Sequence, residues 1–156
     1  MRQEQARDIG LFFLLGLMDE RIALTAAGRA IAKIKAAEKS PTDLVPPAEL
    51  IRVCREYWKV HRRLMPRNQS VESPLDAWVV PPDIEISIWA RYQKDAPDED
   101  IMTILFSLIL GFGDEDMAEG FQTSVGTIRY RLGKGVRQLG LVVRGQKSAL
   151  SSGAVT

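Results

Sequence analysis

Apolar residues recur every three or four positions along most of the chain, which is the spacing of one face of an α-helix. Residues 3–18, 20–38 and 47–64 form three segments with this pattern. Pro47 opens the third segment at a position where a helix tolerates proline. The pattern predicts three amphipathic helices in the first part of the chain.

The helical pattern stops in one stretch and then resumes. Residues 65–83 contain four prolines and several polar turn formers, a composition that does not fit a helix. After this stretch the helical spacing returns, and acidic residues open two of the segments, as the positive end of a helix dipole favours. The predicted helices are 84–93, 98–111, 114–121 and 124–140.

These segments divide the chain, which we predict to be all-α. Residues 1–66 are expected to form a helical N-terminal module, 67–83 a proline-rich linker, and 84–145 a C-terminal four-helix domain. Residues 146–156, QKSALSSGAVT, are small and polar, and we expect a disordered tail there.

The charges of the second half are segregated along the chain, although the formal net charge of all 156 residues is only +1. Residues 95–124 hold eight acids and no Lys or Arg, whereas residues 125–156 hold six Lys or Arg and no acid. Such a sharp change of sign within one small domain predicts two faces with different partners.

Residues 114–140 have the spacing of a helix-turn-helix, in which a tight turn joins two helices. The small Ala118 allows the second helix to cross close to the first, and Ser124 is a typical N-cap for the second helix. The inward apolar positions are Met117, Phe121, Ile128 and Leu132, and the turn is formed by Gln122 and Thr123.

The second of these helices has one thin apolar stripe and a cationic remainder. At about 100° per residue, one side collects Val125, Ile128, Leu132, Val136 and Leu139. The opposite side collects Gly126, Thr127, Tyr130, Lys134 and Arg137, and Arg129 and Arg131 flank the stripe. The stripe would hold the helix on the protein, and the remainder would face a partner.

Double-stranded DNA is the partner that this remainder fits best. Cations on both flanks suit the two phosphate ridges beside a major groove, and the start of such a helix reaches base edges. A solvated basic surface helix is the other interpretation. The predicted DNA-binding residues are Ser124, Val125, Gly126, Thr127, Arg129, Tyr130, Arg131, Lys134 and Arg137, of which Val125, Gly126 and Tyr130 would read bases.

Residues 104–140 resemble region 4 of bacterial sigma factors of the sigma-70 class, especially the extracytoplasmic-function type. The family pattern is an acidic "EE-A-E" helix followed by "S-V-G-T-V-K-x-R-L". The matching residues are Asp116, Met117, Ala118, Glu119, Ser124, Val125, Gly126, Thr127, Ile128, Arg129, Arg131 and Leu132. The resemblance extends from near residue 86 to residue 144, and regulators with a LuxR-type helix-turn-helix share much of the pattern.

The resemblance implies a sigma-factor-like transcription regulator that binds promoter DNA upstream of the start site and contacts the β-flap of core RNA polymerase. The chain departs from the family in three ways. Gln122 occupies a turn position that is usually Gly, Gly133 and Gly135 should weaken the second half of the helix, and residues 1–66 lack the signature of sigma region 2. The alternatives are a dimeric helix-turn-helix regulator without polymerase contact and a protein-binding anti-activator.

Residues 1–66 are expected to bind protein rather than DNA, through a homodimer or another partner. The apolar content of the run at 9–18 exceeds what two short helices bury on one another, so part of it should meet another chain or the C-terminal domain. The run is too short to span a bilayer. We expect no membrane contact and a cytoplasmic location.

Nothing in the sequence indicates an enzyme. There is no nucleophile–base pair, phosphate-binding loop or metal cluster, and no metal or other cofactor is expected. The single cysteine, Cys54, lies in an apolar helix phase and should be a packing residue, and the single histidine, His61, should be solvated.

Overall fold

The computed structural model describes residues 1–40, 43–64 and 85–153, and gives side-chain surroundings as far as residue 145. Regular structure in the described residues is entirely helical, without a strand, so the all-α prediction is confirmed at that level. The predicted linker at 67–83 lies outside the described residues. The elements are α1 (Gln3–Leu17), α2 (Glu20–Ala37), α3 (Pro47–Arg62), α4 (Ile86–Asp95), α5 (Asp98–Ile104), the π-helix η2 (Leu105–Ile109), α6 (Asp114–Phe121) and α7 (Val125–Gly153).

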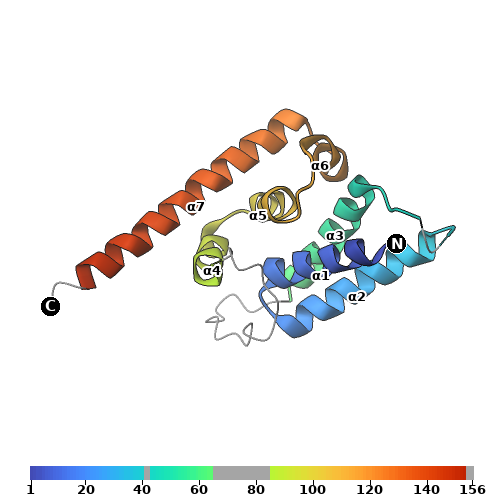
Figure 1. The fold of residues 1–156 in the computed structure, drawn as a ribbon, viewed down its shortest axis with the longest axis horizontal. Helices are drawn as coiled ribbons and strands as arrows, with labels where there is room; N and C mark the ends of the chain where they lie inside the picture. Colours follow the sequence, from blue (N-terminus) through green and yellow to red (C-terminus); the bar gives the residue numbers. More distant parts are fainter. Residues whose placement is uncertain (41–42, 65–84, 154–156) are drawn as a thin grey trace.

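Helices α1, α2 and α3 pack against one another (Figure 1). Asp19 separates the first two, and its Oδ1 accepts the Ile22 backbone N–H at 2.9 Å, which caps α2. Gln5 of α1 fixes the segment before α3, because its side chain donates to the Val45 carbonyl at 2.8 Å and accepts the Val45 N–H at 3.2 Å.

One hydrophobic core joins these helices to the C-terminal ones. The ring of Phe12 in α1 stacks on Phe106 in η2, with centroids 4.5 Å apart. Trp89 and Gln93 of α4 both donate to the Leu15 carbonyl, at 2.7 and 2.6 Å. The apolar run at 9–18 is therefore buried largely within the chain itself. The division into two domains stays a prediction.

The segment predicted as one helix at 98–111 changes its winding partway. α5 runs into the π-helix η2, and Gly111 then adopts a left-handed φ of 73°. The wider turn is stabilised at its end by the Phe112 N–H, which donates to the Phe106 carbonyl at 2.8 Å. Periodicity does not report such an insertion, because the apolar residues on either side still point into the core.

Two further expectations differ from the structure. His61 is buried rather than solvated, and its Nδ1 lies 2.7 Å from the Tyr57 carbonyl one turn earlier. Backbone helix continues through residues 146–153, where the composition predicts a disordered tail, so that α7 extends well past the other helices (Figure 1). Cys54 is buried in the core, as predicted, and burial raises the pKa of its thiol.

Candidate nucleic-acid interface

A tight left-handed turn joins α6 to α7. The Thr123 N–H donates to the Ala118 carbonyl at 2.9 Å, and the Gln122 N–H donates to the Glu119 carbonyl at 3.1 Å. These two bonds form a Schellman motif, which requires a left-handed residue at the helix end. Gln122 is that residue, with φ of 54° and ψ of 49°. It is not glycine, so its side chain carries a conformational cost.

Ser124 caps α7, as the sequence predicts. Its Oγ accepts the Thr127 N–H at 3.1 Å and lies 2.9 Å from the Thr127 hydroxyl. The Ser124 carbonyl accepts the Ile128 N–H at 3.1 Å, which begins the helical ladder. The side chains of Ser124 and Thr127 therefore both stabilise the first turn of α7.

The inner sides of α6 and α7 are packed closely. Met117, Phe121 and Ile128 are buried, as predicted. α6 also packs against α3, and a Cβ at Gly120 would lie 2.6 Å from the Ile51 side chain. The helix-turn-helix is therefore seated on the N-terminal helices as well as on its C-terminal neighbours.

The predicted apolar stripe of α7 faces the core at four of its five positions, because Ile128 is buried and Val125, Leu132 and Leu139 pack beside it. A Cβ at Gly135 would lie 2.9 Å from the Ile104 Cδ1 atom and 3.0 Å from the Tyr92 hydroxyl, so a larger residue there would require these side chains to move. Val136, predicted in the stripe, is 46% exposed. The glycine at this position lets α7 approach α4 and α5 closely.

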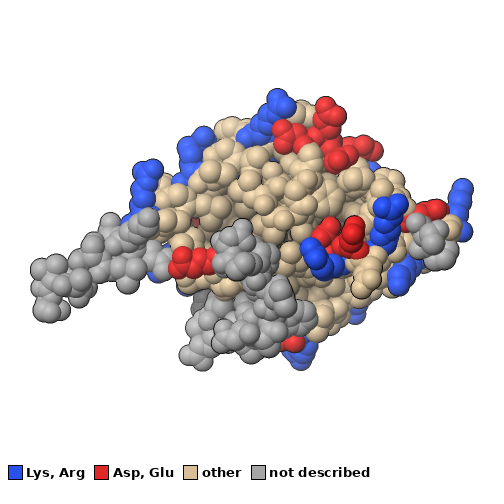
Figure 2. Space-filling model, viewed as in Figure 1, with Lys and Arg blue, Asp and Glu red and all other residues tan. Residues whose placement is uncertain are grey.

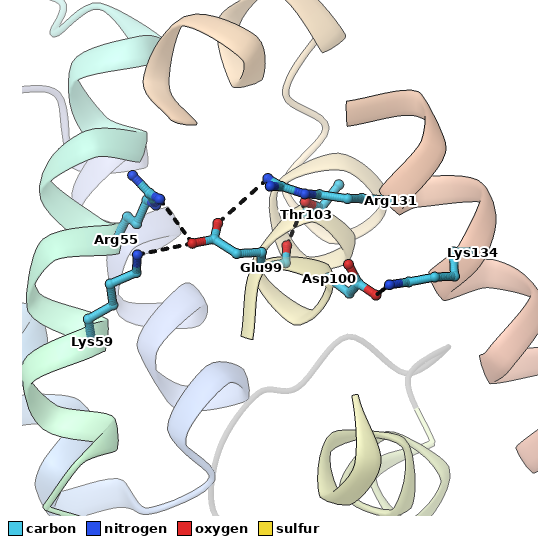
Figure 3. A network of polar contacts seen from close by, with 7 residues as sticks. All are labelled: Arg55, Lys59, Glu99, Asp100, Thr103, Arg131 and Lys134. Atoms are coloured by element: carbon cyan, nitrogen blue, oxygen red, sulfur yellow. Dashed lines mark hydrogen bonds and ion pairs between the residues drawn. The ribbon is translucent and has the colours of Figure 1, made fainter. Parts of the chain in front are cut away.

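Arg131 and Lys134 are cations of α7 that lie against acids of α5 (Figure 3). Lys134 Nζ lies 2.7 Å from the buried Asp100 Oδ2, and Arg131 Nη1 lies 3.7 Å from Glu99 Oε2. The sequence placed Lys134 opposite the apolar stripe, but in the structure it lies against α5. The physical reason is that α5 presents two carboxylates to this flank of α7.

The open side of α7 retains the rest of the predicted site. Tyr130 is 64% exposed, and nothing outside its own turn approaches within 4 Å of a Cβ placed at Gly126. Arg137 is exposed. Arg129 is also exposed, although its Nε donates to Asp114 Oδ2 of α6 at 2.9 Å. Val125 is half-buried and packs on the core.

Arg144 is an exposed cation on α7 that the predicted site did not include. Figure 2 shows Lys and Arg side chains along the α7 edge of the molecule and Asp and Glu side chains over α6. The charge separation along the sequence thus becomes two adjacent surfaces of opposite sign. The acids of α6 are Asp114, Glu115, Asp116 and Glu119.

Glu99 is held ionised by two cations of α3. Burial opposes its ionisation, but hydrogen bonds and charges from Arg55 and Lys59 outweigh that effect, so the pKa of Glu99 lies below its ordinary value. The pKa of Tyr92 is shifted in the opposite direction. Burial, with a smaller contribution from the charge of Asp100, raises the pKa of Tyr92 to about 12.

No known protein family matches this chain, and no curated protein is significantly similar to it in sequence. The described residues contain no helix with both the length and the apolar character needed to cross a membrane. The same part of the chain brings together no group of His, Cys, Asp and Glu side chains suited to a metal ion.

Proposed function

We propose that this protein is a sigma-factor-like transcription regulator that binds double-stranded DNA through α6 and α7. The observation that supports it best is the capped start of α7. A tight turn and the Ser124 cap fix this end of the helix, and Gly126 and Tyr130 lie on its open side. A helix presented in this way fits a major groove with its first turns against the base edges.

The residues of the open side would have different roles in DNA binding. Arg129 and Arg137 would neutralise phosphates beside the groove, which gives affinity but little sequence preference. Gly126 would allow the backbone to approach the bases, and the exposed Tyr130 hydroxyl would donate to a base edge. Val125 would offer a methyl group to thymine from the edge of the open side.

A selection of bound sequences from random duplex DNA tests this proposal. The wild-type chain should return a defined motif. Gly126→Glu should bind it more weakly while remaining folded, because the site is open and a carboxylate there repels phosphate. Tyr130→Ala should change the preferred base more than it changes non-specific affinity. The same motif from wild type and Tyr130→Ala would remove Tyr130 from base recognition.

Contact with core RNA polymerase is the part of the proposal that rests on the family resemblance. Core polymerase should co-purify with the full chain from its host, and the association should survive nuclease treatment. A preparation free of polymerase subunits would favour a helix-turn-helix regulator that acts through DNA alone, for instance as a homodimer.

Protein binding by the same two helices is the second candidate function. The observation in its favour is the acidic surface of α6, which lies beside α7 and would repel phosphates (Figure 2). Charge substitutions distinguish the two functions. Arg137→Gln should weaken DNA binding and reduce its salt dependence, whereas Glu115→Gln, at an exposed acid of α6, should weaken a protein complex but not DNA binding.

A further inference from the structure

Helix α3 carries a row of cations on the side that its apolar residues leave free. Arg52, Arg55, Lys59 and Arg63 follow one another at intervals of three or four residues, which places them on one side of the helix. Arg52 and Arg63 are exposed, and Lys59 is 41% exposed in its side chain. The nearby Glu56 is engaged elsewhere, because its carboxylate lies 2.6 Å from Lys33 of α2.

The carboxylate of Glu99 contacts cations of this row and a cation of α7 (Figure 3). Glu99 Oε1 lies 2.9 Å from Arg55 Nη2 and 3.0 Å from Lys59 Nζ of α3, and its Oε2 lies 3.7 Å from Arg131 Nη1 of α7. Three cations thus share a single negative charge, which leaves a local excess of two positive charges (+3 − 1 = +2). The neighbouring Asp100 does not reduce this excess, because it is paired with Lys134.

The cations around Glu99 are partly exposed, so their excess positive charge lies at the surface. The side chains of Arg55 and Arg131 are 27% and 24% exposed. The longest of the three contacts is the one to Arg131, which directly follows the outward-facing Tyr130 in α7. The row on α3 is therefore continuous with one flank of the open side of α7, where the second phosphate ridge of a bound duplex would lie.

We propose that Arg55, Lys59 and Arg131, with Arg52 of the same row, form a second phosphate-binding surface for the DNA duplex that α7 binds. This inference rests on the proposed function and assigns part of the N-terminal helices to the DNA interface. The occupant is the sugar–phosphate backbone, because the four side chains that form the surface are all cations and carry an excess of positive charge. Glu99 orients the cations and lowers the affinity of the surface for phosphate.

The test uses the full chain, a labelled duplex carrying the selected motif and fluorescence anisotropy between 50 and 200 mM salt. Lys59→Gln should bind the duplex more weakly than wild type at low salt. Because it lacks one phosphate contact, the ratio of the two association constants should fall by about threefold across this range. Lys35→Gln removes an exposed cation from α2 and should behave as wild type.

The variant Glu99→Gln distinguishes a phosphate-binding surface from a cluster that only stabilises the fold. Removing the carboxylate should raise DNA affinity at low salt, and this gain over wild type should shrink by about threefold between 50 and 200 mM salt, as one more phosphate contact predicts. A structural role predicts unchanged or weaker binding. Thermal unfolding shows whether this variant is folded at the assay temperature, and if it is not, Lys59→Gln alone decides.

The outcomes separate this inference from the proposed function. If the wild-type chain binds no duplex, both fail. If wild type binds and Arg137→Gln weakens it, but Lys59→Gln equals wild type and Glu99→Gln does not bind more tightly, the proposed function stands and the surface on α3 is overturned. A smaller salt dependence for Lys59→Gln together with tighter binding by Glu99→Gln supports the surface.

Discussion

Gly135 and Gly140 are both interior residues of α7 but have different surroundings. A Cβ at Gly135 would approach Ile104 to 2.9 Å, whereas nothing lies within 4 Å of one at Gly140. Glycine lowers helix stability wherever it lies, so its presence at Gly135 reflects a packing requirement and its presence at Gly140 does not.

Alanine at these two glycines should therefore act in opposite directions. Gly140→Ala should raise the free energy of unfolding by about 1 kcal/mol, through helix propensity alone. Gly135→Ala should lower it by about 1–2 kcal/mol, because the overpacking against Ile104 exceeds that gain. Urea unfolding followed by circular dichroism measures both. Equal stabilisation by the two substitutions would show that α7 does not approach α5 at Gly135.

Like Met18 at the end of α1, Gln122 has a left-handed backbone conformation that residues with a Cβ disfavour. Its φ of 54° suits glycine, and Gln122→Gly should raise the free energy of unfolding by about 1 kcal/mol. Gln122→Ala is the matched control and should give no such gain, because alanine also has a Cβ. Thermal unfolding of the three proteins compares them, and a glycine variant less stable than wild type would contradict the turn described for α6.

At the scale of elements, Glu99 connects three helices, α3, α5 and α7. Because cations favour its ionised form in the folded protein, its pKa is lower there than in the unfolded chain. A group of this kind stabilises the fold above its unfolded pKa and loses that contribution as the pH falls through the folded value.

The stability difference between wild type and Glu99→Gln should follow this titration. Wild type should be the more stable protein at neutral pH, and the difference should shrink as the pH falls below 4.5, the ordinary value for this carboxyl group. Urea unfolding at several pH values measures it. A difference that stays constant down to pH 3 would mean that the Glu99 charge does not hold the three helices together.

The sequence predicts the helices better than their orientation. Apolar spacing and the acidic opening place the bounds of α6 at residues 114–121, and the structure agrees. The orientation of α7 was predicted in part: Ile128, Leu132 and Leu139 face the core as expected, but Val136 does not, and Gly135 has no side chain to mark it as buried. The contacts of Arg131 and Lys134 likewise depend on acids more than 30 positions earlier, which a helical wheel does not include.

At the scale of the whole molecule, the N-terminal and C-terminal helices share one core. Phe12 stacks on Phe106, and Trp89 donates to the Leu15 carbonyl. This arrangement buries most of the apolar run at 9–18 without a partner chain. Whether residues 1–66 also form a homodimer stays a prediction.

Cleavage within residues 67–83 should therefore leave the two fragments bound to each other. An inserted protease site there should give two fragments that elute together in gel filtration and separate only in denaturant, because parting them would expose the Phe12–Phe106 contact to water. Separate elution of two folded fragments under native conditions would show that the two parts do not share a core in solution.

The central claim is that the open side of α7 binds duplex DNA, and the salt dependence of binding tests it most directly. Fluorescence anisotropy of a labelled duplex should give an association constant that falls with salt as a straight line on logarithmic axes. Arg137→Gln should reduce this slope by about one unit, and Arg29→Gln, an exposed cation on α2, should leave it unchanged. No detectable binding, or equal slopes for wild type and Arg137→Gln, would contradict the account.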